Sequence, residues 1–162
     1  MLMTESSPNH RHDVRLRLAR SDDAGRLLDW RNDPGTRAMY GDTAPVDFAS
    51  HTAWLENKLE DVNSRLFIAE AGDEAVGYIR FDSRGFTECE ISISTAPSHR
   101  GRGLALPILR EGCVTARRLW PTRAISARVK TANEGSHRLF RAGGFKETAR
   151  DAGMIYYSLP ST

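Results

Sequence analysis

The chain has few cysteines, no long apolar run and no large excess of either charge. Its 162 residues include only Cys89 and Cys113, too few for a secreted disulfide scaffold, so reduced thiols are expected. No stretch reaches the roughly 18 apolar residues of a membrane-spanning helix, and the N-terminus has no apolar signal core. The formal net charge of +2 is too small to indicate a nucleic-acid surface. We therefore expect a cytoplasmic protein that binds neither membranes nor nucleic acids.

The first twelve residues give no sign of a metal site. Residues 1–12 are polar and contain Pro8, so a flexible tail is expected. His10 and His12 have no acidic or thiol cluster nearby and are expected to be solvated. The sequence predicts no metal.

Residues 13–162 are expected to form one domain. Predicted strands occupy 14–18, 65–70, 75–81, 88–95, 124–130, a segment after Phe145, and 154–159. Predicted helices occupy about 22–32, 48–61, 105–120 and part of 133–145. The segment 71–74 has the composition of a hairpin turn. This order predicts an α/β (α+β) fold, with a single mixed, mostly antiparallel sheet of about seven strands and about four helices on its two faces.

The predicted helix 48–61 carries a candidate core stripe. Phe48, Leu55 and Leu59 lie near one side of it and are expected to pack in the core. His51 and Trp54 are amphipathic, and we expect them to face a site instead.

One glycine-containing segment lies between the predicted strand 88–95 and the next helix: Arg100-Gly101-Arg102-Gly103-Leu104-Ala105. Glycines can adopt positive φ there, so the unpaired N–H groups of the helix start can approach a phosphate closely. The segment lacks the Gly-Lys-Ser/Thr ending of a P-loop, and Leu106 replaces the third glycine of a dinucleotide fingerprint. The sequence predicts a phosphate-binding loop, and an ordinary glycine-containing surface turn is the alternative.

Two motifs resemble those of the GNAT family of N-acetyltransferases. Arg100, Gly103 and Ala105 resemble its Arg/Gln-x-x-Gly-x-Gly/Ala signature. A second segment resembles the family's Asn-x-x-Ala/Ser-x-x-Leu-Tyr/Phe-x-x-x-Gly-Phe pattern through Asn133, Ser136, Leu139, Phe140, Gly144 and Phe145. The resemblance implies a GNAT domain over 13–162 with acetyl-coenzyme A as co-substrate. The residues it implies in cofactor binding are Ile93, Ser94, Thr95, Arg100, Gly101, Arg102, Gly103, Leu104, Ala105, Asn133, Ser136 and Phe140.

The resemblance also implies direct acetyl transfer to an amine, which requires a base because an amine with a pKa near 10 is protonated at pH 7. Glu90 and Glu88 lie on one face of the predicted strand 88–95, where two like charges tend to raise one pKa. They are the candidate catalytic residues, and solvated strand positions are the alternative.

Protonation of the leaving thiolate is left open. Phe140 occupies the place of the tyrosine that often donates this proton in the family. Tyr156, Tyr157, Tyr78 or water are the remaining candidates.

Four further segments bear on the acceptor: Trp30-Arg31-Asn32-Asp33-Pro34, His51-x-x-Trp54, Glu90-Ile91-Ser92-Ile93-Ser94 and Ala127-Arg128-Val129-Lys130. They resemble one branch of the family, the acetyltransferases of bacterial pseudaminic-acid and related amino-sugar pathways, whose acceptor is a UDP-linked 4-amino sugar. The candidate acceptor-binding residues are Trp30, Arg31, Asn32, His51 and Arg128. Alternatives are a protein N-terminus of the ribosomal-protein type, a small amine, or a noncatalytic domain that senses coenzyme A. A small-molecule amine is the expected partner, and a homodimer is among the expected assemblies.

Overall fold

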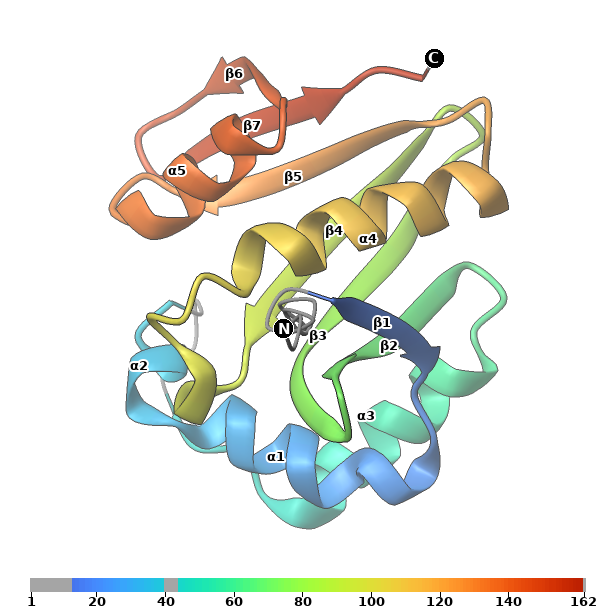
Figure 1. Cartoon of the computed structure of the whole chain (residues 1–162), viewed down its shortest axis with the longest axis vertical. Helices are drawn as coiled ribbons and strands as arrows, with labels where there is room; N and C mark the ends of the chain where they lie inside the picture. Colours follow the sequence, from blue (N-terminus) through green and yellow to red (C-terminus); the bar gives the residue numbers. More distant parts are fainter. Residues whose placement is uncertain (1–12, 40–43, 162) are drawn as a thin grey trace, which may run out of the picture.

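The computed structural model describes residues 13–39 and 44–161, so the predicted tail 1–12 lies outside the described residues. Within them, the chain forms one seven-stranded sheet of order β1-β2-β3-β4-β5-β7-β6 (Figure 1). The strands are β1 Val14–Leu18, β2 Ser64–Ala71, β3 Glu74–Arg84, β4 Glu88–Thr95, β5 Ala124–Lys130, β6 Lys146–Arg150 and β7 Met154–Leu159. The predicted mixed, mostly antiparallel sheet is confirmed.

The sheet opens in its centre, between β4 and β5. These two strands are parallel, whereas every other neighbouring pair of described strands is antiparallel. Their register runs only from Glu88↔Ala124 to Glu90↔Ser126. Beyond that pair the two strands continue but diverge (Figure 1). We call the point after the Glu90–Ser126 pair the fork.

Helices cover both faces of the sheet. The helices are α1 Ala24–Asn32, α2 Pro34–Arg37, α3 Phe48–Glu60, α4 Ala105–Leu119 and α5 Glu134–Ala142, with 3-10 turns at Ser21–Asp23 and Pro97–His99. The four predicted helices are present, and α2 is added because Pro34 opens a new short helix at N1 after α1 ends. Asp33 caps it by accepting a hydrogen bond from the Thr36 N–H at 3.0 Å.

Alternation along the strands separates two apolar clusters. Phe67 and Ala69 of β2 pack in one cluster with Ile108 and Leu109 of α4. The intervening residue Ile68 packs in the other cluster, with residues of α1 and α3. Successive side chains of a strand point to opposite faces, so α4 and the α1–α3 layer cover opposite faces of the sheet.

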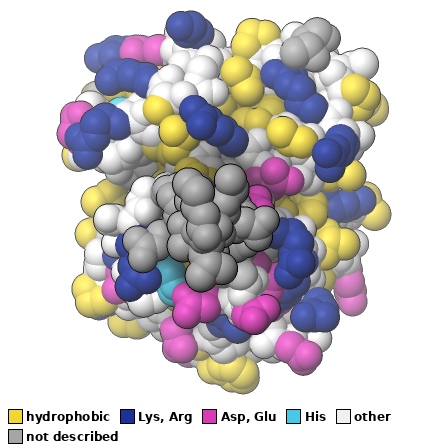
Figure 2. Space-filling model, in the orientation of Figure 1, with side chains coloured by type: hydrophobic (Ala, Val, Ile, Leu, Met, Phe, Trp, Pro, Cys, Tyr) yellow, Lys and Arg dark blue, Asp and Glu magenta, His cyan; other side chains and the backbone are white. Residues whose placement is uncertain are grey.

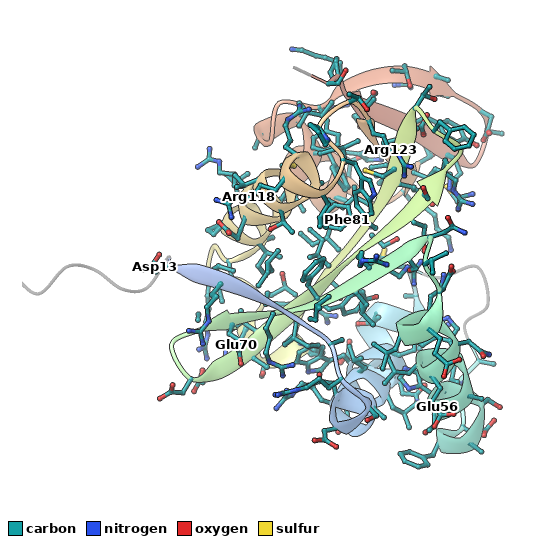
Figure 3. The ribbon with its side chains drawn as sticks, turned by 90° about the vertical axis from the view of Figure 1, so that its right-hand side faces the viewer. Asp13, Glu56, Glu70, Phe81, Arg118 and Arg123 are labelled. Atoms are coloured by element: carbon teal, nitrogen blue, oxygen red, sulfur yellow. The ribbon has the colours of Figure 1, made fainter. Side chains whose placement is uncertain are left out.

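The face that carries α4 is closely packed. Phe81 of β3 is fully buried and lies between the sheet and α4, whereas Arg118 of α4 and Glu56 of α3 lie on the outside (Figure 3). A Cβ added at Gly112 would lie 2.2 Å from the Ile79 Cδ1 atom, so any other residue there would force the Ile79 side chain to move. α4 therefore packs directly against β3 and β4 on this face.

The packing of α3 differs from the prediction. Leu55 is buried as expected, but Phe48 is 61% exposed and Leu59 is 38% exposed, so their assignment to the core was wrong. The buried residues of α3 are instead His51 and Leu55, and Leu55 packs with residues of α1 and β2. The inward face of α3 therefore carries a titratable side chain.

The surface mixes side chains of both charges. Figure 2 shows basic, acidic and hydrophobic side chains interspersed over the described part of the face seen in Figure 1. None of the helices in residues 13–39 and 44–161 has the length and apolar character needed to cross a bilayer.

Candidate functional site

The glycine loop has the backbone geometry of an anion site. Gly101 and Gly103 have φ values of 72° and 73°, the left-handed conformation predicted from the sequence. The N-cap of α4, Leu104, provides no side-chain capping bond. The first α-helical hydrogen bond joins the Ile108 N–H to the Leu104 carbonyl at 3.0 Å, which leaves the preceding amides of the helix start without helical acceptors. The positive end of the α4 dipole adds to their attraction for a phosphate.

Two side chains tie this loop to other elements. His99 hydrogen-bonds through Nε2 to Glu74 at 2.8 Å. Arg100 donates from Nη1 to Asp33 Oδ2 at 2.8 Å, and this hydrogen bond keeps the pKa of Asp33 below its usual range. The Arg100 guanidinium therefore faces α2, while Arg102 is exposed.

An unpaired strand edge continues from the fork toward the glycine loop. The Ala96 N–H donates to the Val76 carbonyl of β3 at 2.7 Å. The backbone N–H and C=O groups of successive residues in a strand point to opposite sides. Those of Ser94 therefore also point toward β3, whereas those of Ile93 and Thr95 point toward β5. Since β5 pairs with no described residue of β4 beyond Glu90, this edge can hydrogen-bond a ligand.

The second motif forms the start of α5 and part of the core. The side chain of Asn133 caps α5 by accepting the Ser136 N–H at 3.2 Å. Phe140 is 4% exposed and stacks on Tyr157, with the ring centroids 6.0 Å apart. Asn133 and Ser136 thus lie at the N-terminal end of α5, the end nearer to β5 in the sequence. Phe140, further along α5, packs in the core.

The two candidate catalytic carboxylates line one hollow of about 570 Å³ on the sheet face opposite α4. We call it the Glu90 hollow; its lining includes Arg84, Glu88, Glu90, Ser126, Arg128 and Tyr156. Arg84 and Arg128 donate to Glu90 Oε1 at 3.2 and 3.1 Å. Among the described residues, no hydrogen bond reaches Glu90 Oε2. Glu90 is therefore oriented by two guanidinium groups and keeps one oxygen for a ligand.

The tyrosines named from the sequence have different environments. Tyr157 is 1% exposed, and its hydroxyl lies 2.7 Å from His137 Nδ1. His137 Nε2 lies 3.1 Å from the Thr131 carbonyl, which can only accept, so Nε2 carries the proton and Tyr157 donates to Nδ1. Tyr156 faces the Glu90 hollow, and its hydroxyl donates to Asp151 at 3.1 Å, which raises its pKa. Tyr157 also contributes to the lining of the Glu90 hollow, but its hydroxyl proton is directed to His137.

A second hollow, of about 270 Å³, lies between the sheet and the α1–α3 layer. We call it the α1–α3 hollow; its lining includes Arg31, Val46, His51, Trp54, Tyr78 and Arg80. None of its described lining residues is an aspartate or glutamate. The hollow is therefore aromatic and cationic in character.

Four of the five candidate acceptor residues belong to this region. Arg31 and His51 line the α1–α3 hollow. Asn32 holds its wall, because its side chain accepts the Val46 N–H and donates to the Val46 carbonyl, both at 2.8 Å. Trp30 packs beside the hollow in the α1–α3 cluster. Arg128 is separate from them and lies in the Glu90 hollow.

Sequence reasoning missed the arginines of β3. Arg80 lines the α1–α3 hollow, and Arg84 binds Glu90. Both lie on the same face of β3 as Tyr78, so the period of two was the signal that could have identified them.

His51 is buried in a lining position with one nitrogen unsatisfied. The residue is 5% exposed, and its Nδ1 atom is buried without a hydrogen-bond partner among the described residues. Burial, with the nearby Arg31 charge, lowers the pKa of His51. No group of three or more His, Cys, Asp or Glu side chains in the described parts of the chain could hold a metal ion.

Comparison with known proteins identifies the family. The acetyltransferase (GNAT) domain family matches residues 13–146. Acetyltransferase PseH of Campylobacter jejuni is 26% identical over 80 residues, which are 49% of this chain and 50% of PseH, so the match spans about half the length of that relative.

Solved structures share the fold. The spermidine N-acetyltransferase of Vibrio cholerae, solved with CoA and spermine, has a TM-score of 0.82 at 17% identity, covering 91% of this chain and 95% of that one. Campylobacter jejuni PseH in complex with acetyl coenzyme A has a TM-score of 0.75 at 18% identity, covering 93% and 100%. With the family match over most of the chain, these observations show that the chain belongs to the acetyltransferase (GNAT) family, the N-acetyltransferases that use acetyl-coenzyme A as co-substrate.

Proposed function

We propose that this protein transfers the acetyl group of acetyl-coenzyme A to a primary amine on an acceptor that also carries negative charge, best matched by a UDP-linked 4-amino sugar. The lining of the α1–α3 hollow is the observation that supports this choice of acceptor. Arg31 and Arg80 bring guanidinium groups to it, and Arg80 also pairs with Asp82 at 2.7 Å. Trp54 and Tyr78 give it aromatic surface, and no described lining residue is acidic. Such a lining attracts a nucleotide diphosphate and repels a polyamine.

The donor would lie along the unpaired edge of β4. The amides of the glycine loop and of the α4 start are suited to the pyrophosphate. Ile93 and Thr95 offer backbone groups to the amides of the pantetheine arm, with Asn133 and Ser136 on the α5 side. This placement brings the thioester end of the co-substrate to the fork, beside Glu90.

Glu90 is the base in this proposal. Its Oε2 atom accepts a proton from the acceptor ammonium, directly or through water, while Arg84 and Arg128 hold Oε1. The amine nitrogen then forms a bond to the thioester carbonyl carbon, its second proton passes to water, and the carbon–sulfur bond breaks. A backbone N–H of the open β4 edge stabilises the developing oxyanion.

Water is the proton donor to the leaving thiolate in this proposal. The bond to Asp151 raises the pKa of Tyr156, so that phenol releases its proton less readily. Tyr157 is buried with its proton committed to His137. Water reaches the fork through the Glu90 hollow.

The experiment that tests the function follows release of free coenzyme A thiol with three acceptors: a UDP-linked 4-amino sugar, spermidine, and a peptide with a free N-terminus. We expect the highest kcat/KM with the sugar nucleotide. The variant Arg31→Gln should raise its KM by about tenfold, the loss of about 1.4 kcal/mol of binding. Arg118→Gln, on the outside of α4, is the matched control and should leave the KM unchanged (Figure 3).

The other outcomes separate the alternatives. Turnover only with spermidine or only with the peptide would contradict the acceptor but leave acetyl transfer intact. Tight binding of coenzyme A without turnover of any amine would contradict catalysis and favour a sensor domain.

Location and assembly complete the proposal. Acetyl-coenzyme A is a cytoplasmic metabolite, so the reaction is assigned to the cytoplasm. A homodimer is the assembly that we predict, and light scattering after size-exclusion chromatography measures it.

A further inference from the structure

Arg100 joins two segments that are far apart in the sequence. It opens the glycine loop, yet its Nη1 atom donates to Asp33 at 2.8 Å and its Nη2 atom donates to Thr36 Oγ1 at 2.5 Å. These partners lie 67 and 64 positions earlier in the chain. Figure 1 shows the segment after β4 beside α2.

Asp33 and Thr36, at the start of α2 and within it, both accept hydrogen bonds from the Arg100 guanidinium. Asp33 uses Oδ2 both to cap α2 through the Thr36 N–H and to accept from Arg100. Thr36 is buried. A Cβ added at Gly35 would lie 3.0 Å from Arg100 Nη1 and 3.2 Å from Asp33 Oδ2, so glycine leaves room for the pair.

The same corner supports the wall of the α1–α3 hollow. Asn32 directly precedes Asp33 and holds Val46 through two hydrogen bonds of 2.8 Å. Val46 lines the hollow together with Arg31, which precedes Asn32. A series of hydrogen bonds therefore connects the glycine loop to the wall of the α1–α3 hollow through the segment 31–36.

We propose that Arg100 is a positioning residue that couples the two sites: through Asp33 and Thr36 it transmits the ordering of the glycine loop by coenzyme A to the wall of the α1–α3 hollow. The phosphate contacts are made by the loop amides, and the Arg100 side chain acts through α2. The assignment of that hollow to the acceptor rests on the proposed function. Coupling of this kind is reciprocal, so an acceptor would strengthen coenzyme A binding by the same factor.

The second tie of the loop provides a matched control. His99 binds Glu74 at the start of β3, a contact that does not involve α2. Glu74→Gln weakens a tie of the same loop without touching α2. Asp33→Asn weakens the Arg100 pair, and its amide oxygen retains the cap of α2, because Asn caps helices as well as Asp does.

Hydrogen–deuterium exchange of the full chain, with coenzyme A alone as the probe, tests the proposal. The measured quantity is the difference between the free and the coenzyme A-bound protein, because a merely structural role would change both states equally. In the wild type, coenzyme A should slow exchange in 98–106 and also in 31–38. Asp33→Asn should keep the protection of 98–106 and lose that of 31–38, whereas Glu74→Gln should keep both. Thr36→Val removes the other acceptor of Arg100 and should act like Asp33→Asn.

Three results would overturn the coupling. Wild-type protection in 31–38 that survives in both Asp33→Asn and Thr36→Val would show that Arg100 does not carry it. Protection confined to 98–106 in the wild type would remove the coupling and leave the donor site in place. Protection in neither segment would contradict the donor site as well, which distinguishes this failure from a wrong acceptor.

Discussion

Glu90 of β4 and Ser126 of β5 form the last residue pair between these parallel strands before they separate. Glu90 is therefore anchored by paired backbone on both sides, while the next residues of β4 are open toward β5. Its side chain is only 12% exposed and is bound by Arg84 and Arg128. A carboxylate held by two guanidinium groups thus lies where an opened strand edge meets a hollow, and in the proposed reaction this position lets it take a proton from an incoming amine.

We predict that Glu90→Gln lowers kcat/KM by about 10²–10⁴-fold, the usual contribution of a general base. The amide cannot accept the proton of the ammonium group, although it keeps the shape of the side chain. The measurement is the pH profile of kcat/KM with the best acceptor, and the fall of activity toward acid should flatten in the variant.

Glu88→Gln is the control for Glu90→Gln. Glu88 lines the same hollow but lies two residue pairs further from the fork than Glu90, so its variant should retain the wild-type profile. An unchanged rate and profile in Glu90→Gln would remove Glu90 from the mechanism.

Gly103→Val should raise the KM for acetyl-coenzyme A by about tenfold or more, since forcing a side chain into the left-handed region costs roughly 1–2 kcal/mol and the loop must relax away from its anion-binding shape. Steady-state kinetics at saturating acceptor measures this KM. Gly25→Ala is the control: it lies in α1, has nothing within 4 Å of an added Cβ, and has no positive φ. A normal KM in Gly103→Val would mean that the co-substrate does not use this loop.

The alternation of side chains along β4 could be predicted from the sequence, because successive residues of a strand face opposite sides of the sheet. Glu88 and Glu90 were expected to share one face, and Cys89 and Ile91, which alternate with them, are buried on the other. The glycines before α4 were readable for a similar reason, since a turn into a helix start demands their backbone freedom.

Contacts between residues far apart in the sequence could not be predicted in this way. No local pattern indicates that Arg100 pairs with Asp33, because the contact depends on how α2 meets the glycine loop. The inward face of α3 was also misjudged: three apolar residues suggested one stripe, but packing against α1 and β2 selected the side with His51 and Leu55. Helix propensity predicts that the segment is helical, but packing against the neighbouring elements determines which of its faces is buried.

The neighbouring tyrosines of β7 should respond differently to removal of their hydroxyl groups. Tyr157→Phe should lower the free energy of unfolding by about 1–3 kcal/mol, because it leaves the buried His137 Nδ1 without its donor. Tyr156→Phe should leave kcat within about twofold of the wild type if water protonates the thiolate. Urea denaturation and kcat are the two measurements. A large loss of kcat in Tyr156→Phe would instead make Tyr156 the acid.

His51 should make the stability of the protein depend on pH in a window of its own. Burial and the Arg31 charge lower the pKa of His51 below its ordinary value of about 6.5. As the pH falls through that ordinary value, the unfolded chain binds a proton that the folded protein still refuses, so the unfolded state is favoured. The stabilisation is present above about pH 6.5 and is lost progressively below it.

The variant His51→Gln isolates this effect, because glutamine is polar but does not titrate. Half-buried carboxylates such as Asp82, whose pKa is lowered because the Lys58 and Arg80 interactions outweigh burial, lose their contribution only near and below pH 4. Urea denaturation between pH 7 and pH 5 therefore reports on His51 with little contribution from these groups. The free energy of unfolding should fall toward pH 5 more steeply in the wild type than in His51→Gln. Equal slopes would show that His51 can be protonated in the folded protein, and its role as a neutral group in the α1–α3 hollow would then be wrong.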